Sequence, residues 1–215
     1  MPHGRLFIGS KRYSSWSLRG WLAVRMAGLD IEEVVIPLAG GATPAVKAAS
    51  PSGFVPYLEH AGVRIWDSLA IAEYCAEHAP GLWPADRAIR ASARAVAAEM
   101  HSGFRELRIA MPYNACRTFP GRGRTEGALA DIARIEAVWA ECLAAHGGPF
   151  LFGAAFTLAD AFYAPIAGRF LTYDPPLSAT SRAYVEAVRA HPLVDEWYHG
   201  ATAEPAEWRI AKYEE

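Results

Sequence analysis

Within its first 36 residues the chain has the pattern of a strand, a helix and a second strand. Leu6 to Gly9 is a short apolar run typical of a buried strand, and Glu32 to Ile36 is another. Between them, apolar residues recur at helical spacing from Ser15 to about Ala27, and Gly28 follows as a typical end signal. The strands of such a unit run parallel, so the sequence predicts an α/β domain.

The next segment adds a hairpin and another helix. After a loop that holds one helical turn from Pro44 to Ala49, two strands at residues 57–59 and 63–65 flank a tight turn. Asp67 and Ser68 then cap a helix that runs to about His78. We therefore expect the first 79 residues to form one domain with the element order β-α-β-(α)-β-β-α.

Beyond residue 80 the pattern is entirely helical. The Pro-Gly-Leu-Trp-Pro stretch at residues 80–84 interrupts the preceding pattern, and we expect a linker over residues 80–88. Apolar residues then predict one long helix from Ile89 to Met111, which Pro112 ends, and further helices follow. The expected second domain, residues 89–215, is all-helical, and its Thr157-Leu-Ala-Asp160 capping pattern has a structural role.

Composition excludes several classes of partner. The 215 residues suffice for two small domains, and 52% hydrophobic with 20% charged residues is typical of a soluble globular chain. A net charge of −2 gives no reason to expect nucleic acid or a membrane surface as a partner, and no apolar run approaches the roughly 20 residues that cross a bilayer. The cysteines at positions 75, 116 and 142 are widely spaced, which predicts a cytoplasmic location without disulfides or a metal site.

Two serines stand where the first helix begins. One of them, Ser14 or Ser15, suffices as an N-cap, because its oxygen accepts from the free N–H groups of the first turn. The second hydroxyl, with those N–H groups and the positive end of the helix dipole, suits an anion such as a thiolate. Both serines are therefore candidate catalytic residues, against the simpler interpretation of a cap alone. Ser17 and Arg19 are interpreted as a packing residue and a surface charge.

Four features occur in register along the chain: the Ser14-Ser15 pair, the segment Pro51-Ser52-Gly53-Phe54-Val55-Pro56, the segment Asp67-Ser68-Leu69-Ala70-Ile71, and Phe152-Gly153 followed by Thr157 and Asp160. Together they resemble the glutathione S-transferase family over the whole chain. The Ser-Ser-x-Ser-x-Arg pattern is most similar to the zeta class and to bacterial serine-type members. This resemblance implies a thioredoxin-like N-terminal domain, an all-helical C-terminal domain and a homodimer.

The resemblance also suggests roles for individual residues. Ser14 would donate its hydroxyl to the glutathione thiolate, with Ser15 as the second candidate. A hydroxyl donor contributes about 1.5–3 kcal/mol and a helix N-terminus about 0.3–1, enough to lower a thiol pKa of about 8.5 by about two units. The residues expected to bind glutathione are Lys47, Val55, Pro56, Asp67 and Ser68, with a cis Val55–Pro56 bond that lets the Val55 backbone pair with the ligand like an added strand.

The second substrate is expected to meet the helical domain. Residues 108–117 mix apolar side chains with Tyr, Asn and Arg, which suits the wall of a pocket for an electrophile with an anionic or polar handle. The residues predicted to line this pocket are Tyr13, Trp16, Met111, Tyr113, Asn114, Arg117 and Arg169. Tyr13 is also a less favoured thiol donor, since some classes of the family use a tyrosine.

We therefore expect a glutathione transferase in which glutathione is the co-substrate and the thiolate attacks small electrophiles, a detoxification chemistry. One alternative is a glutathione-dependent cis–trans isomerase of the maleylacetoacetate or maleylpyruvate type. Trp16 disfavours it, because this bulky residue stands where the zeta motif has cysteine. The other alternative is a non-catalytic glutathione-binding or assembly module.

Overall fold

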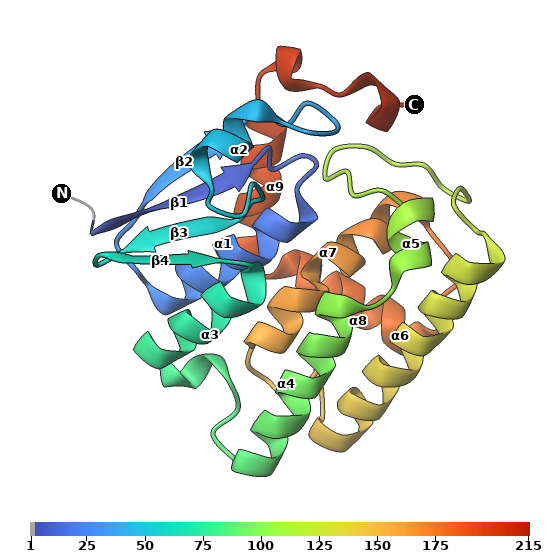
Figure 1. Cartoon of the computed structure of the whole chain (residues 1–215). Helices are drawn as coiled ribbons and strands as arrows, with labels where there is room; N and C mark the ends of the chain where they lie inside the picture. The colour runs from blue at the N-terminus through green and yellow to red at the C-terminus, as the bar shows by residue number, and fades with distance from the viewer. Residues whose placement is uncertain (1–2) are drawn as a thin grey trace.

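The computed structural model describes residues 3–215, in which one four-stranded sheet lies beside a group of helices (Figure 1). The strands are β1 (Gly4–Gly9), β2 (Glu32–Ile36), β3 (Tyr57–His60) and β4 (Val63–Trp66). They lie in the order β2-β1-β3-β4, with β1 parallel to β2 and antiparallel to β3, and with β3 antiparallel to β4. The predicted strand–helix–strand unit and hairpin are confirmed.

Helices cover both faces of this sheet. Strand side chains alternate between the two faces, so the apolar residues of β1 need a cover on each side. The helices are α1 (Ser15–Ala27), α2 (Pro44–Ala49) and α3 (Ser68–His78). Leu6 and Ile8 of β1 are buried with side chains of α1 and α3. Phe7 points to the opposite face and packs with Val46 of α2. The first turn of α1 therefore follows the carboxyl end of β1, whose last four residues are buried.

The second half of the chain consists of helices around a buried central one. These are α4 (Arg87–Ser102), α5 (Arg105–Ala110), α6 (Glu126–His146), α7 (Leu158–Tyr173), α8 (Ala179–Ala190) and α9 (Pro192–Ala203), with 3-10 turns η1 (Pro80–Leu82), η2 (Ala206–Trp208) and η3 (Ala211–Tyr213). Nearly all residues of α7 are buried, and it packs against α1, α4 and α8. A helix that is apolar on every side is stable only in such a central position.

The prediction of one long helix from Ile89 to Met111 is wrong, because this segment forms two helices, α4 and α5. Gly103 ends α4, and a Cβ there would lie 2.7 Å from the Glu99 carbonyl oxygen. Phe104 then adopts a φ of 60°, which a helix cannot continue through. Buried apolar residues keep helical spacing on both sides of the break, so periodicity alone does not reveal it.

Asp160 organises the start of α7. Its side chain is fully buried and accepts hydrogen bonds from the backbone N–H groups of Leu151 (2.9 Å) and Thr157 (2.8 Å). The hydroxyls of Thr157 (2.9 Å) and Tyr184 (3.1 Å) also donate to it. The predicted capping box is therefore present, and it also ties α7 to α8 and to the preceding loop.

The two halves share one hydrophobic core. A single cluster of buried side chains extends from Leu6 in β1 through Trp21 in α1 to Trp139 and Trp197 in the helical half. The predicted domain limits, 1–79, 80–88 and 89–215, stay a prediction, and the first two residues lie outside the described part. Within the described residues no helix has both the length and the apolar character needed to span a membrane.

Candidate functional site

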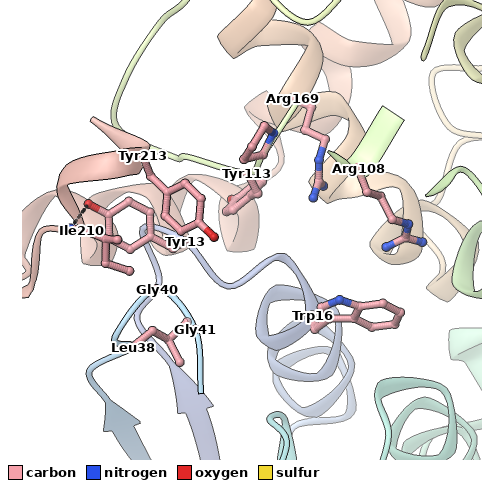
Figure 2. Close-up of a pocket in the computed structure, with 11 residues that line it drawn as sticks. Tyr13, Trp16, Leu38, Gly40, Gly41, Arg108, Tyr113, Arg169, Ile210 and Tyr213 are labelled. Atoms are coloured by element: carbon pink, nitrogen blue, oxygen red, sulfur yellow. Dashed lines mark hydrogen bonds between the residues drawn. The ribbon is translucent and has the colours of Figure 1, made fainter. Parts of the chain in front are cut away.

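Trp16, in the first turn of α1, lines two cavities. The first cavity, of about 400 Å³, is also lined by Val55, Pro56, Asp67 and Ser68. The second cavity, of about 370 Å³, is lined among others by Tyr13, Arg108, Tyr113, Arg169, Ile210 and Tyr213 (Figure 2). Both cavities are therefore lined by the residue that follows the serine pair predicted to be functional.

The first cavity contains four of the five residues predicted to bind glutathione. Its wall includes the Val55–Pro56 peptide bond, which is cis as the sequence predicts. Helix α1 approaches this bond closely at Gly20, where a Cβ would lie 2.7 Å from the Pro56 ring. The remaining predicted residue, Lys47, is exposed on α2 and does not belong to the described wall.

Asp67 and Ser68 occupy the N-terminus of α3 at the edge of the first cavity. Asp67 has a φ of 74°, an unusual conformation for a residue other than glycine, and its carboxylate accepts from the Leu69 N–H at 2.7 Å. Nε2 of His101 on α4 lies 3.3 Å from the same carboxylate. The Ser68 hydroxyl is buried without a hydrogen-bond partner among residues 3–215. An unpaired hydroxyl at a helix N-terminus suits an anionic ligand group.

The pairing of Asp67 predicts a pH-dependent contribution to stability. Burial raises the pKa of Asp67, but hydrogen bonds from His101 and the Leu69 N–H outweigh it and hold the pKa below its ordinary value. A carboxyl group whose pKa is lower in the folded chain than in the unfolded chain stabilises the fold at any pH above its unfolded-state pKa, which is about 3.9 for Asp. This stabilisation is lost as the pH falls through the folded-state pKa. We expect Asp67→Asn to lower the Tm at pH 7, with a gap to wild type that narrows below about pH 4. Thermal unfolding of both proteins from pH 7 to 3 checks this, and a constant gap contradicts it.

The two serines have different hydrogen bonds. Ser14 is the N-cap of α1, where its oxygen accepts from the Ser17 N–H at 3.3 Å and its hydroxyl donates to the Ser17 hydroxyl at 2.7 Å. Ser17 in turn accepts from the Gly9 N–H at 2.9 Å. The Ser15 hydroxyl accepts from Arg169 of α7 at 3.3 Å. Neither serine belongs to the described walls of the two cavities, although both directly precede Trp16.

Tyr13 is bound to the end of the chain. Its hydroxyl donates to the Glu214 carboxylate at 2.6 Å and accepts from the Ile210 N–H at 3.0 Å. Burial, followed by the hydrogen bond to Glu214, raises the pKa of Tyr13 to about 12. The tyrosine proton is therefore already engaged by a carboxylate, which argues against Tyr13 as the donor to a thiol.

The C-terminal tail, residues 204–215, forms one wall of the second cavity. Asn114 donates to the Tyr213 carbonyl at 2.7 Å, Arg117 donates to the Glu214 carbonyl at 3.0 Å, and Lys212 donates to the Gly40 carbonyl. Figure 1 shows the tail passing over the sheet-bearing half of the molecule. The sequence does not indicate this wall, because the tail has no periodic apolar pattern and gains its order from distant residues.

The second cavity includes four of the seven residues predicted for it. Tyr13, Trp16, Tyr113 and Arg169 line it, whereas Met111 is fully buried in the core. The other two predicted residues bind the tail, as described above. The cavity also contains Arg108, which sequence analysis did not single out although it begins the predicted polar run.

Two guanidinium groups extend into the second cavity from the helical half. Figure 2 shows Arg108 and Arg169 pointing toward the side of the cavity formed by Trp16. Arg169 is anchored through the Met111 carbonyl at 2.8 Å, and burial lowers its pKa to about 10, so it remains charged at neutral pH. Arg108 donates to the Gly103 carbonyl at 3.0 Å, but its Nη1 has no partner among the described residues. The cavity therefore favours an anionic ligand.

Comparisons with known proteins agree with this arrangement. A family pattern described as "Glutathione S-transferase, N-terminal domain" matches residues 13–78, and the one described as "Glutathione S-transferase, C-terminal domain" matches residues 122–200. The chain belongs to the glutathione S-transferase family. A curated relative, glutathione S-transferase 1 of Dianthus caryophyllus, is 29% identical over 211 residues, which cover 89% of this chain and 95% of the relative.

Solved structures agree in fold. A glutathione transferase homologue from Burkholderia strain BGR1, with bound glutathione, has a TM-score of 0.72 and 24% identity over 95% of this chain and all (100%) of that chain. The theta class enzyme of Xanthomonas axonopodis pv. citri, also with glutathione bound, has a TM-score of 0.67 and 24% identity over 95% of this chain and 99% of that chain. The predicted family and two-part architecture are thus confirmed, while the zeta-like subtype stays a prediction.

Proposed function

We propose that this member of the glutathione S-transferase family binds glutathione in the first cavity, activates its thiol with Ser14, and brings it to a small electrophile in the second cavity. The observation that carries the proposal is that Trp16, two residues after Ser14, lines both cavities. Solved relatives that hold glutathione support glutathione as the co-substrate.

Thiol activation needs only the groups at the start of α1. The Ser14 proton is donated to the Ser17 hydroxyl, and a hydroxyl turns freely about its C–O bond. Donation to a thiolate instead is a charge-assisted hydrogen bond, about twice as strong as one between neutral groups. The free N–H groups at the N-terminus of α1 add to this stabilisation. No general base is required, because the thiol proton leaves to solvent.

Each part of glutathione has a complementary group in or near the first cavity. The Val55 N–H and C=O would pair with the cysteinyl unit as an added strand. The Ser68 hydroxyl at the start of α3, which has no hydrogen-bond partner within residues 3–215, would hold the γ-glutamyl carboxylate, and Asp67 its ammonium group. Lys47, on the exposed side of α2, would reach the glycyl carboxylate. Phe54 stands where family members often have a cationic residue, so that contact is expected to be absent.

The second cavity supports an electrophile that combines a flat apolar body with an anionic group. Tyr13, Tyr113 and Tyr213 supply aromatic walls, whereas Arg108 and Arg169 supply positive charge. A guanidinium pairs with carboxylates in a planar, two-point geometry. We therefore expect electrophiles with a carboxylate to be preferred over neutral ones.

The same positive charge favours a second candidate function. A cis–trans isomerase of the maleylacetoacetate or maleylpyruvate type would need to bind a substrate with carboxylates, and Arg108 and Arg169 suit such a substrate. The bulk of Trp16 beside the thiol argues against this reaction, because the adduct must rotate about its central bond. The transferase therefore remains the leading proposal.

A glutathione titration followed by two assays tests these functions. The ultraviolet absorbance of the thiolate, measured against pH in the presence of the protein, is expected to show a thiol pKa about two units below that of free glutathione. Conjugation rates with a neutral aromatic halide and with its carboxylated analogue then measure transferase activity and the preference for anions. Isomerisation of maleylacetoacetate, measured in a separate assay, would identify an isomerase instead of a transferase. Absence of glutathione binding would leave only the assembly module.

We also propose that the chain forms a homodimer. Phe54, Val63 and Trp66, on β4 and the loop before the third strand, are 76%, 46% and 47% exposed, which is high for large apolar side chains. Exposed large apolar side chains often mark a protein interface, and most soluble oligomers are symmetric homo-oligomers. The cytoplasmic location and a role in detoxification rest on the sequence analysis alone.

Val63 offers a test of the homodimer that avoids both cavities. We expect wild type to sediment as a dimer and Val63→Glu to shift toward the monomer, because a buried unpaired carboxylate is costly. Ile109→Glu on α5, where the side chain is 57% exposed, serves as the matched control. A monomeric wild type would contradict the proposal.

A further inference from the structure

Arg19 carries a charge that is buried in the protein interior. Its side chain is 0% exposed, and none of its three guanidinium nitrogens has a hydrogen-bond partner among residues 3–215. The guanidinium carbon lies 4.7 Å from the centre of the Trp16 ring and 5.5 Å from that of Phe162 on α7. The interpretation of Arg19 as a surface charge is therefore wrong. Burial of an unpaired charge is expensive, so such a group is expected to have a function.

The surroundings of Arg19 are positive overall. The charged and titratable groups that act on it, with the elements that carry them, are Arg108 (α5), Arg169 and Tyr163 (α7) and Asp67 (N-cap of α3), while His101 (α4) contacts the Trp16 ring at 5.2 Å. Asp67, the carboxylate in this group, is already paired with His101 at 3.3 Å. Among these residues, the guanidinium groups of Arg19, Arg108 and Arg169 are therefore balanced by only one carboxylate, that of Asp67, and it is already paired.

Arg19 keeps its charge in this environment. Burial, followed by the charges of Arg108 and Arg169, lowers its pKa. A guanidinium nevertheless stays protonated in proteins, because its ordinary pKa exceeds 12. The positive charge of this region is therefore present at any physiological pH, and binding of an anion would partly neutralise it.

The field reaches the start of α1. Arg19 lies one helical turn after Ser15 and lies over the ring of Trp16, which lines both cavities. The neighbouring residue, Gly20, packs on the Pro56 ring that lines the first cavity. A charge surrounded by aromatic rings is poorly screened by water, so it acts over longer distances than a surface charge.

We propose that Arg19 stabilises the glutathione thiolate electrostatically from beneath the Trp16 ring, without touching it. The inference rests on the proposed function and adds a residue to it. In this step the S–H bond breaks, the proton passes to solvent, and the electron pair stays on sulfur. Arg19 is thus a positioning residue that acts on the thiolate through its positive charge. The Ser14 hydroxyl acts on the same thiolate through a hydrogen bond.

Arg19→Met tests the proposal, with Arg25→Met as the matched control. Arg25 belongs to the same helix but is partly exposed and paired with Glu196. Titration of the thiolate absorbance on the full chain is expected to show a thiol pKa about one unit higher in Arg19→Met, which means about tenfold less thiolate at a fixed lower pH. Arg25→Met should match wild type.

Binding of S-methylglutathione separates this role from contact with the peptide part of the ligand. This analogue has no ionisable thiol, so its affinity for Arg19→Met should stay within about twofold of wild type. Thermal unfolding adds a second readout, because replacing an unpaired buried charge by an apolar side chain of similar size is often neutral or stabilising. We therefore expect the Tm of Arg19→Met to equal or exceed that of wild type.

Three results would overturn the inference. One is a folded Arg19→Met protein with the wild-type thiol pKa, and another is an equal loss of affinity for glutathione and S-methylglutathione. The third is failure of both Arg19→Met and Arg19→Gln to fold, which would assign Arg19 a structural role. If wild type itself leaves the thiol pKa of glutathione unchanged, the proposed function fails first and this inference fails with it.

Discussion

Replacing Ser14 with alanine is expected to lower kcat/KM for an aromatic halide by about 10- to 100-fold at a pH below the thiol pKa. The reason is the loss of one hydrogen bond to a charged acceptor, which contributes about 1.5–3 kcal/mol. The pKa of bound glutathione should rise by about one to two units in the same variant. Steady-state kinetics and the thiolate titration measure the two effects independently.

Ser178→Ala is the matched control for the loss of a helix cap. Ser178 caps α8 with the same pattern as Ser14, since it accepts from the Ser181 N–H at 3.2 Å and donates to the Ser181 hydroxyl at 3.0 Å. Both substitutions should reduce stability by about 1 kcal/mol, but only Ser14→Ala should change the thiol pKa. Tyr13→Phe should leave the thiol pKa unchanged. A large effect in Ser15→Ala with none in Ser14→Ala would transfer the role to Ser15.

Replacing Asp160 with alanine is expected to destabilise the fold by about 3–5 kcal/mol. The substitution leaves two buried N–H groups and two hydroxyls without their common acceptor, and each unpaired buried group costs about 1–3 kcal/mol. Burial raises the pKa of Asp160, while these hydrogen bonds lower it. For a chain of this size the Tm should fall by about 6–20 °C.

Thermal unfolding of two further variants gives the scale for this effect. Asp160→Asn keeps one acceptor oxygen and should be intermediate, whereas Thr157→Ala removes one hydroxyl and should cost about 1 kcal/mol. Equal Tm values for wild type and Asp160→Ala would contradict the assignment of Asp160 as the organising group of α7. The thiol pKa of any folded variant should stay at the wild-type value, because Asp160 lies outside both cavities.

The parts of the fold that depend on local pattern were predictable. The strands, the hairpin and α1 follow from alternation, turn residues and an end glycine, and the structure agrees within a few residues. The break between α4 and α5 was not predictable from apolar spacing, because Phe104 is buried in register with both helices. A left-handed conformation at such a bulky residue is imposed by its surroundings.

The candidate site divides in the same way. Val55, Pro56, Asp67 and Ser68 belong to contiguous motifs, and the structure brings them to one cavity. The burial of Arg19 was not predictable, since its position on α1 faces α7, which lies about 140 residues later in the chain. Periodicity assigns an arginine to the surface by default, and only the packing of the two halves removes it from water.

The tail also limits how freely parts of such a protein can be exchanged. One side of the second cavity exists only when Tyr13 meets Glu214 and Gly40 meets Lys212, so it is shared between the two ends of the chain. A chimera that joins the sheet-bearing half of this chain to the helical half of a relative would keep its means of holding glutathione. The contacts between its tail and its N-terminal half would not fit each other around the electrophile, so its substrate range would match that of neither parent.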